Sequence, residues 1–160
     1  MSSYRFCAIS LISMVLVSSA GFAAQTGAES IFSEVWNTYP LQKDDGPDIP
    51  ALHKRAMSDT YQKNSENRIL VKVTESFKKF GFIQSRSSYF KNKCSDSVCE
   101  VVLIFNRELK SSEVQNKMDV FNSAAQEAAE NVKGESIVLV TGGENDLSPL
   151  ALLAYIGNVQ

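Results

Sequence analysis

The pattern of apolar and polar positions is most informative in the second half of the chain. Residues 98–105, VCEVVLIF, are β-branched and aromatic and have the composition of a strand buried on at least one face. Residues 82–90 mix aromatic and polar side chains and predict a more exposed partner strand. The segment 91–97 between them is rich in Asn, Ser, Asp and Lys, which favour turns. The pattern therefore predicts a hairpin with its turn at 91–97.

Two cysteines bracket this turn. Four residues separate Cys94 from Cys99, and strand pairing brings their Cα atoms into the range of roughly 4.4 to 6.8 Å that a disulfide needs. Closing so short a loop stabilises the fold by about 2 kcal/mol in the chain-entropy description. A metal or redox site is the alternative, but CxxxxC spacing without a nearby His or further Cys falls short of four zinc ligands. We expect a disulfide.

Three helices are predicted before the hairpin. The first begins with a capping box at Thr26 and ends before Pro40. The second is a weakly amphipathic segment at 50–64, and the third is a stronger one at 65–80 with Gly81 as its stop. The apolar stripes of the first and third helices are Ala28, Ile31, Phe32, Val35, Trp36 and Ile69, Val73, Phe77, Phe80.

A long helix and a short strand follow the hairpin. Ser111 or Ser112 caps a helix that runs to Val132. Its apolar residues lie on one narrow stripe, namely Val114, Met118, Phe121, Ala125, Ala128 and Val132. This spacing predicts packing against a sheet. The continuous apolar run at 137–141 predicts a central strand.

The C-terminal segment predicts a last helix that is apolar all round. Ser148 serves as its cap, Pro149 as its first helical residue and Gly157 as its end. A helix without a polar face must be buried in its own domain or against something else. Either the N-terminal helix with Ile31, Val35 and Trp36 covers it, or part of it stays open to a partner. In the second case the docking residues are Leu150, Leu153, Tyr155 and Ile156.

These elements predict an α+β fold with a small three-stranded, mainly antiparallel sheet packed by amphipathic helices. The order is α-α-α-β-β-α-β-α, with a single α+β domain at 50–160 and an N-terminal helix and linker at 25–49. The order helix, strand, strand, helix, strand over 65–141 resembles that of BON domains and related small envelope modules. Phe105 and Asn106 stand where glycines are expected after the second strand of that pattern.

The first 24 residues have the order of a secretory signal peptide. A start with Arg5 leads into an apolar core at 7–17, too short to span a bilayer, and then into small residues with Gly21 and Ala23. Cleavage removes Cys7 and leaves an even number of cysteines, which supports the disulfide in an exported protein. An uncleaved anchor is the alternative. We expect a periplasmic or secreted protein without a membrane span in its mature chain.

The charge balance argues against nucleic-acid binding. Removal of Arg5 reduces the 16 basic side chains to 15 against 18 acidic ones, a net charge of −3. The distribution is uneven, with eight basic residues against two acidic ones at 63–93 and ten acidic against four basic at 94–146. A solvated surface is one explanation and a contact surface is the other. Arg86, Lys91 and Lys93 are the basic residues that we assign to such a contact surface.

No arrangement of residues indicates a reaction. His53, the single histidine, lies beside Lys54 and Arg55 on a polar helix and is predicted to be surface. The aspartates in the turn-rich linker at 40–50 lack the spacing of a calcium loop, so no metal or cofactor is expected. The glycine pair at 142–143 is more typical of a turn than of a phosphate site. A pair of carboxylates for glycoside hydrolysis remains open, because their distance is set by the fold.

Export, the disulfide and the apolar C-terminal segment lead to three functional hypotheses. The first is a noncatalytic protein-protein interaction module, an accessory or structural component of a bacterial envelope assembly such as a secretion or conjugation apparatus. The second is an inhibitor or immunity protein that blocks a secreted toxin or cell-wall enzyme through the stiffened loop at 91–98. The third is a small hydrolase. The expected partner is a protein of the cell envelope, and a homo-oligomer is a further option.

Overall fold

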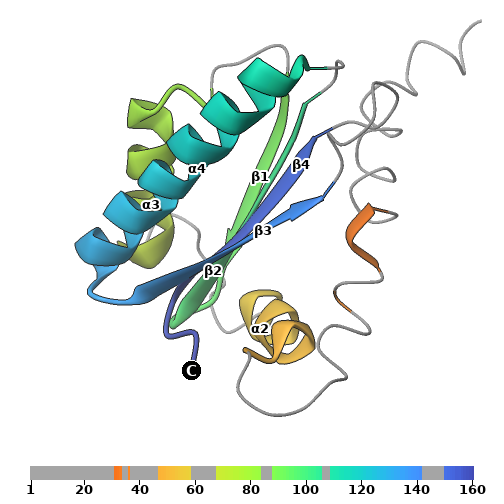
Figure 1. The fold of residues 1–160 in the computed structure, drawn as a ribbon. Coiled ribbons are helices and arrows are strands. Elements are labelled where there is room, and N and C mark those ends of the chain that lie inside the picture. The colour runs from red at the N-terminus through yellow and green to blue at the C-terminus, as the bar shows by residue number, and fades with distance from the viewer. Residues whose placement is uncertain are drawn as a thin grey trace, which may run out of the picture.

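The protein is an α+β domain, as the sequence predicts (Figure 1). The computed structural model describes residues 31–33, 36, 47–58, 68–83, 88–105, 109–141 and 150–160. Residues 31–33 and 36 are helical. The elements that follow are α2 Ile49–Ala56, α3 Arg68–Lys79, β1 Ser88–Cys94, β2 Val98–Phe105, α4 Ser111–Val132, β3 Glu135–Thr141 and β4 Ala151–Gly157.

The four described strands form an antiparallel sheet in the order β1-β2-β4-β3. The predicted sheet had three strands, because the segment that forms β4 was expected to be a helix. That prediction is wrong, because residues 151–157 pair as a strand with both β2 and β3. All seven residues of β4 are buried. A continuous apolar run suits a strand buried on both faces as well as it suits a buried helix, and periodicity does not separate the two. Because β4 inserts beside β2, the run at 137–141 lies in edge strand β3, not in the predicted central position.

The partner strand of the hairpin is shifted along the chain from its predicted place. β1 covers Ser88–Cys94 rather than 82–90, and only residues 95–97 separate it from β2. Phe82 instead follows the end of α3, where its backbone N–H donates to the Phe77 carbonyl at 3.1 Å. Lys91 and Lys93, predicted in the turn, therefore lie in a strand.

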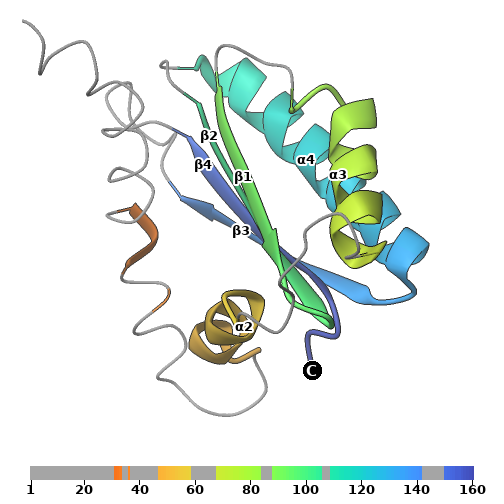
Figure 2. The same ribbon diagram turned by 180° about the vertical axis from the view of Figure 1, so that it is seen from behind.

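Helices α3 and α4 cover one face of the sheet (Figures 1 and 2). Gly81 ends α3 with a φ of 82°, which confirms its predicted role. Lys110, not Ser111 or Ser112, is the N-cap of α4, and the Glu113 carboxylate accepts from the Lys110 backbone N–H at 3.1 Å. The predicted stripe of α4 does pack against the sheet, and its alanines allow a close approach.

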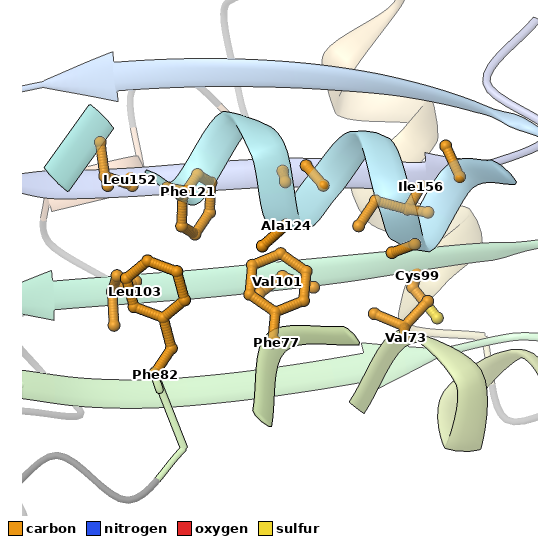
Figure 3. Close-up of a cluster of buried hydrophobic side chains, with 14 of the residues drawn as sticks. Val73, Phe77, Phe82, Cys99, Val101, Leu103, Phe121, Ala124, Leu152 and Ile156 are labelled. Carbon is orange, nitrogen blue, oxygen red and sulfur yellow. The ribbon is translucent and has the colours of Figure 1, made fainter. Parts of the chain in front are cut away.

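The core beneath these helices is apolar and aromatic (Figure 3). Phe121 of α4 meets Phe77 and Phe82 edge to face, with ring centroids 5.3 and 5.8 Å apart. These rings lie against the helix-side residues of the two central strands, which are Cys99, Val101, Leu103, Phe105, Leu152, Ala154 and Ile156.

Helix α2 and the helical residues 31–33 and 36 cover the second face of the sheet. Phe32, Ile49 and Leu52 are buried there against Leu153 and Tyr155 of β4. Ile31 and Trp36 pack at the border of the same cluster. Ile31 and Trp36 thus cover one face of the C-terminal segment, as one of the two predicted arrangements has it, although the covered segment is a strand. Val35, the third residue predicted for this cover, lies outside the described residues.

Candidate functional site

The hairpin tip is held by the disulfide between Cys94 and Cys99, which is present as predicted. The two residues lie directly opposite each other, with Cα atoms 4.0 Å apart. Around the turn, the Ser95 N–H donates to the Val98 carbonyl at 2.9 Å, and the Val98 N–H donates to Ser95 Oγ at 3.2 Å. The Asn158 N–H donates to the carbonyl of Ser97 at 2.8 Å. The tip is therefore fixed both across the hairpin and to the C-terminal residues.

The basic residues proposed for contact lie beside this tip on β1. Lys91 is exposed and pairs with Val102, whereas Lys93 is half-buried and pairs with Glu100. Because alternate residues of a strand share a face, both side chains project on the α2 side of the sheet. Arg86 lies outside the described residues.

Glu100 is a buried carboxylate in the middle of an otherwise apolar strand. It is 3% exposed, and its Oε2 accepts a hydrogen bond from the Tyr155 hydroxyl at 2.8 Å. The same oxygen lies 2.5 Å from Nδ1 of His53 on α2. The pairing register places Lys93, Glu100 and Tyr155 in one row across three strands. A buried charge needs such partners, since an unpaired one is costly.

Tyr155 and Trp36 complete this polar cluster. Burial, followed by the negative charge of Glu100 and the hydrogen bond to it, raises the pKa of the Tyr155 hydroxyl far above its usual value. The Trp36 indole stacks on the His53 ring, with centroids 4.2 Å apart and planes inclined by 12°. Its buried N–H lies near the Tyr155 hydroxyl but has no hydrogen-bond acceptor among the described residues.

The cluster attaches the covering segments to the sheet. The prediction that His53 is merely surface is wrong, because its side chain is only 27% exposed and contacts the Glu100 carboxylate. Arg55 on the same helix donates to the backbone carbonyls of Asn158 and Gln160. One signal in the sequence indicates this site. Glu100 lies in the apolar run VCEVVLIF, so its carboxylate needs hydrogen-bond donors when buried, and His53 is the single histidine of the chain.

The four residues named for docking at the C-terminus lie inside the molecule. Leu150 and Ile156 belong to the core beneath α3 and α4, and Leu153 and Tyr155 belong to the core beneath α2. All four are buried. In this structure they bind the two helical layers to the sheet and form no exposed surface.

A shallow hollow lies where the end of α4 meets the C-terminus. Its volume is about 510 Å³, and it is lined by Ile69, Ser97, residues 132–135 and residues 157–160. Across the described ranges, no three His, Cys, Asp or Glu side chains gather where they could hold a metal ion. Within the same ranges, no helix is both long and apolar enough to cross a membrane.

Comparison with protein-family models, with curated proteins and with solved structures finds no match for this chain.

Proposed function

We propose that the protein is an exported, noncatalytic protein-protein interaction module that serves as an accessory or structural part of a bacterial envelope assembly. The observation that carries this proposal is the basic edge strand β1. It presents the exposed Lys91 beside a hairpin tip that the Cys94–Cys99 disulfide cross-links. A contact surface that is rigid before binding loses less entropy when the partner arrives.

The charge on this strand suits an acidic partner surface. Complementary charge speeds the encounter of two proteins and falls off with added salt. The signal-like residues 1–24 and the disulfide both suit an oxidising compartment outside the cytoplasm.

The polar cluster supports a structural role for the chemically active side chains. Glu100 and Tyr155 are buried and bonded to each other, and His53 is bound to the same carboxylate. In this arrangement their polar atoms hold α2 on the sheet.

The inhibitor hypothesis receives less support from the hairpin. It needs a projecting loop at 91–98, whereas residues 91–94 belong to β1 and Ser95 is buried. The short turn at 95–97 is also tied to Asn158.

The test of this function is a capture experiment from envelope extract, followed by binding kinetics with the captured protein. Lys91→Glu should slow association and weaken its salt dependence while leaving the melting temperature unchanged. Lys78→Glu is the matched control, because Lys78 is an exposed lysine on α3, on the other side of the sheet. Lys93→Glu is unsuitable, since it would place two carboxylates directly opposite each other on paired strands. Equal binding by the Lys91→Glu variant and the wild type would refute a contact through β1.

Export has its own test. Mass spectrometry of the protein recovered from the producing cells should show a chain that lacks the signal segment. The mass should also lack both thiol hydrogens of Cys94 and Cys99. A full-length chain in which Cys94 and Cys99 are free thiols would contradict the proposal.

A further inference from the structure

Strand β3 forms one edge of the sheet of described strands, opposite the edge formed by β1. It lies at the front rim of the sheet in Figure 1, and β1 lies at the front in Figure 2. Among the described strands β3 pairs with β4 alone, so one side of its backbone is left without a strand partner. Unpaired edges of this kind are templates for another strand.

The pairing register identifies which peptide groups face outward. Phe105 donates its N–H to the Leu150 carbonyl, so even-numbered residues of β4 direct their peptide groups toward β2. Odd-numbered residues of β4 therefore direct theirs toward β3, where Thr141, Leu139, Ile137 and Glu135 are their partners. It follows that Ser136, Val138 and Val140 direct their N–H and C=O groups outward.

The sequence of this edge strand offers little protection against pairing. Its seven residues, ESIVLVT, contain no Lys, Arg or Pro, and the single charge is Glu135 at one end. Val140 is 41% exposed and is one of two large hydrophobic side chains exposed among the described residues. The opposite edge strand β1, in contrast, bears Lys91 and Lys93.

We propose that a second copy of this chain pairs with β3, antiparallel and with Val138 on the twofold axis. In this register Val138 faces Val138 of the other copy, and Ser136 faces Val140. All three outward peptide groups of each strand then find partners. The result is a continuous eight-stranded sheet across two copies, built from two four-stranded sheets. Because the twofold axis is normal to the sheet, helices α3 and α4 of both copies lie on the same side of it.

The side chains favour a second copy over an unrelated peptide. In the symmetric register Ile137 lies next to Leu139 of the partner strand, so apolar residues meet apolar residues. Glu135 lies opposite the neutral Thr141, so no like charges meet. If the register slipped by one residue, the outward N–H and C=O groups of one strand would lie opposite residues of the other copy whose N–H and C=O groups point toward β4. The hydrogen bonds between the copies would then be lost, which disfavours that register.

Cysteine cross-linking tests the register on the full exported chain. Val138→Cys should form a disulfide-linked dimer under mild oxidation, because hydrogen-bonded antiparallel partners have Cα atoms roughly 5.5 Å apart, within disulfide range. Val140→Cys is the matched control and should not cross-link, since residue 140 and its copy are four residues out of register, roughly 13 Å along the strand. Peptide mapping verifies that Cys94–Cys99 is intact. Cross-linking of Val140→Cys but not Val138→Cys would overturn the register.

Mass in solution tests the pairing without a new cysteine. The wild type should show a dimer by light scattering that dissociates on dilution. Val140→Pro removes one outward N–H and no bond to β4, and Val140→Lys places a charge on the edge. Both variants should be monomeric, with melting temperatures close to that of the wild type at dilutions where its dimer has dissociated. Val71→Lys, the same change at the exposed valine of α3, should still dimerise. A wild type that is monomeric at every concentration would overturn the proposal. This holds also if β3 of the monomer binds an extended segment of another protein.

Discussion

The two faces of the sheet are built on different principles. The face beneath α3 and α4 is an apolar core in which Phe121 packs edge to face on Phe77 and Phe82, over aliphatic strand residues. The face beneath α2 contains a buried carboxylate, Glu100, with its tyrosine and imidazole partners. On the first face any close-packing side chains of the right volume would stabilise the fold. On the second face hydrogen-bond geometry decides where the covering helix lies.

The difference bears on specificity. An apolar face tolerates a helix that slides or rotates, provided that the volume is filled. A buried carboxylate does not tolerate this, because a shift of α2 would leave Glu100 without the His53 donor. We therefore infer that the polar cluster positions α2 while the aromatic core supplies most of the stability.

The largest expected effect is on the apolar face beneath α3 and α4. Phe121→Ala removes a fully buried ring from the centre of the aromatic core and should lower the free energy of unfolding by about 3–5 kcal/mol. Urea denaturation measures it. Phe80→Ala is the control, because Phe80 is only half-buried at the end of α3 and should cost clearly less. Similar losses for the two variants would refute the central role of Phe121.

A smaller loss is expected on the polar face. Tyr155→Phe keeps the packing but takes one donor from the buried Glu100 carboxylate, which should cost about 1.5–3 kcal/mol. A double-mutant cycle with Glu100→Gln isolates the interaction between the two side chains. Strict additivity of the two substitutions would show that the hydrogen bond contributes nothing.

The same tyrosine predicts a dependence on alkaline pH. Its pKa is raised in the folded state, so above the unfolded value of about 10 only the unfolded chain releases this proton. Stability should then fall as pH rises, by up to about 1.4 kcal/mol per pH unit more in the wild type than in Tyr155→Phe. Denaturation curves of both proteins across this range measure the difference. Parallel curves would contradict burial of a neutral tyrosine.

The disulfide is expected to contribute about 2 kcal/mol, because it closes a short loop. The double substitution of Cys94 and Cys99 by alanine should lower the urea midpoint by a corresponding amount with little change in slope. Reduction of the wild type with a phosphine serves as the independent comparison. A stability loss near zero would mean that hairpin pairing alone holds the tip.

The smallest effect is expected at the surface. Lys79 and Glu127 pair at 2.7 Å between α3 and α4, with side chains 68% and 29% exposed. Lys79→Met should change stability by only about 0–1 kcal/mol, since solvent screens such pairs. A loss as large as that of Tyr155→Phe would erase the proposed distinction between buried and exposed charges.

The elements with local signals could be predicted from the sequence alone. The amphipathic stripe of α3 with Gly81 at its end, the stripe of α4 and the cysteine-bracketed turn each lie within one stretch of chain, so periodicity and turn chemistry predict them. The difference between the predicted strand at 82–90 and β1 at Ser88–Cys94 had no local signal. Phe82 and Tyr89 are both aromatic and both suit a strand, yet Phe82 lies in the loop after α3 and Tyr89 lies in β1.

The conformation of the C-terminal segment and the partners of Glu100 depend on contacts between distant parts of the chain. The run ALLAYIG is apolar at every position, and only its place between β2 and β3 makes it a strand. The contact between His53 and Glu100 joins residues 47 positions apart. Local periodicity reports which side chains avoid water but not which of them meet, because a pairing of that separation depends on how the whole chain closes its sheet.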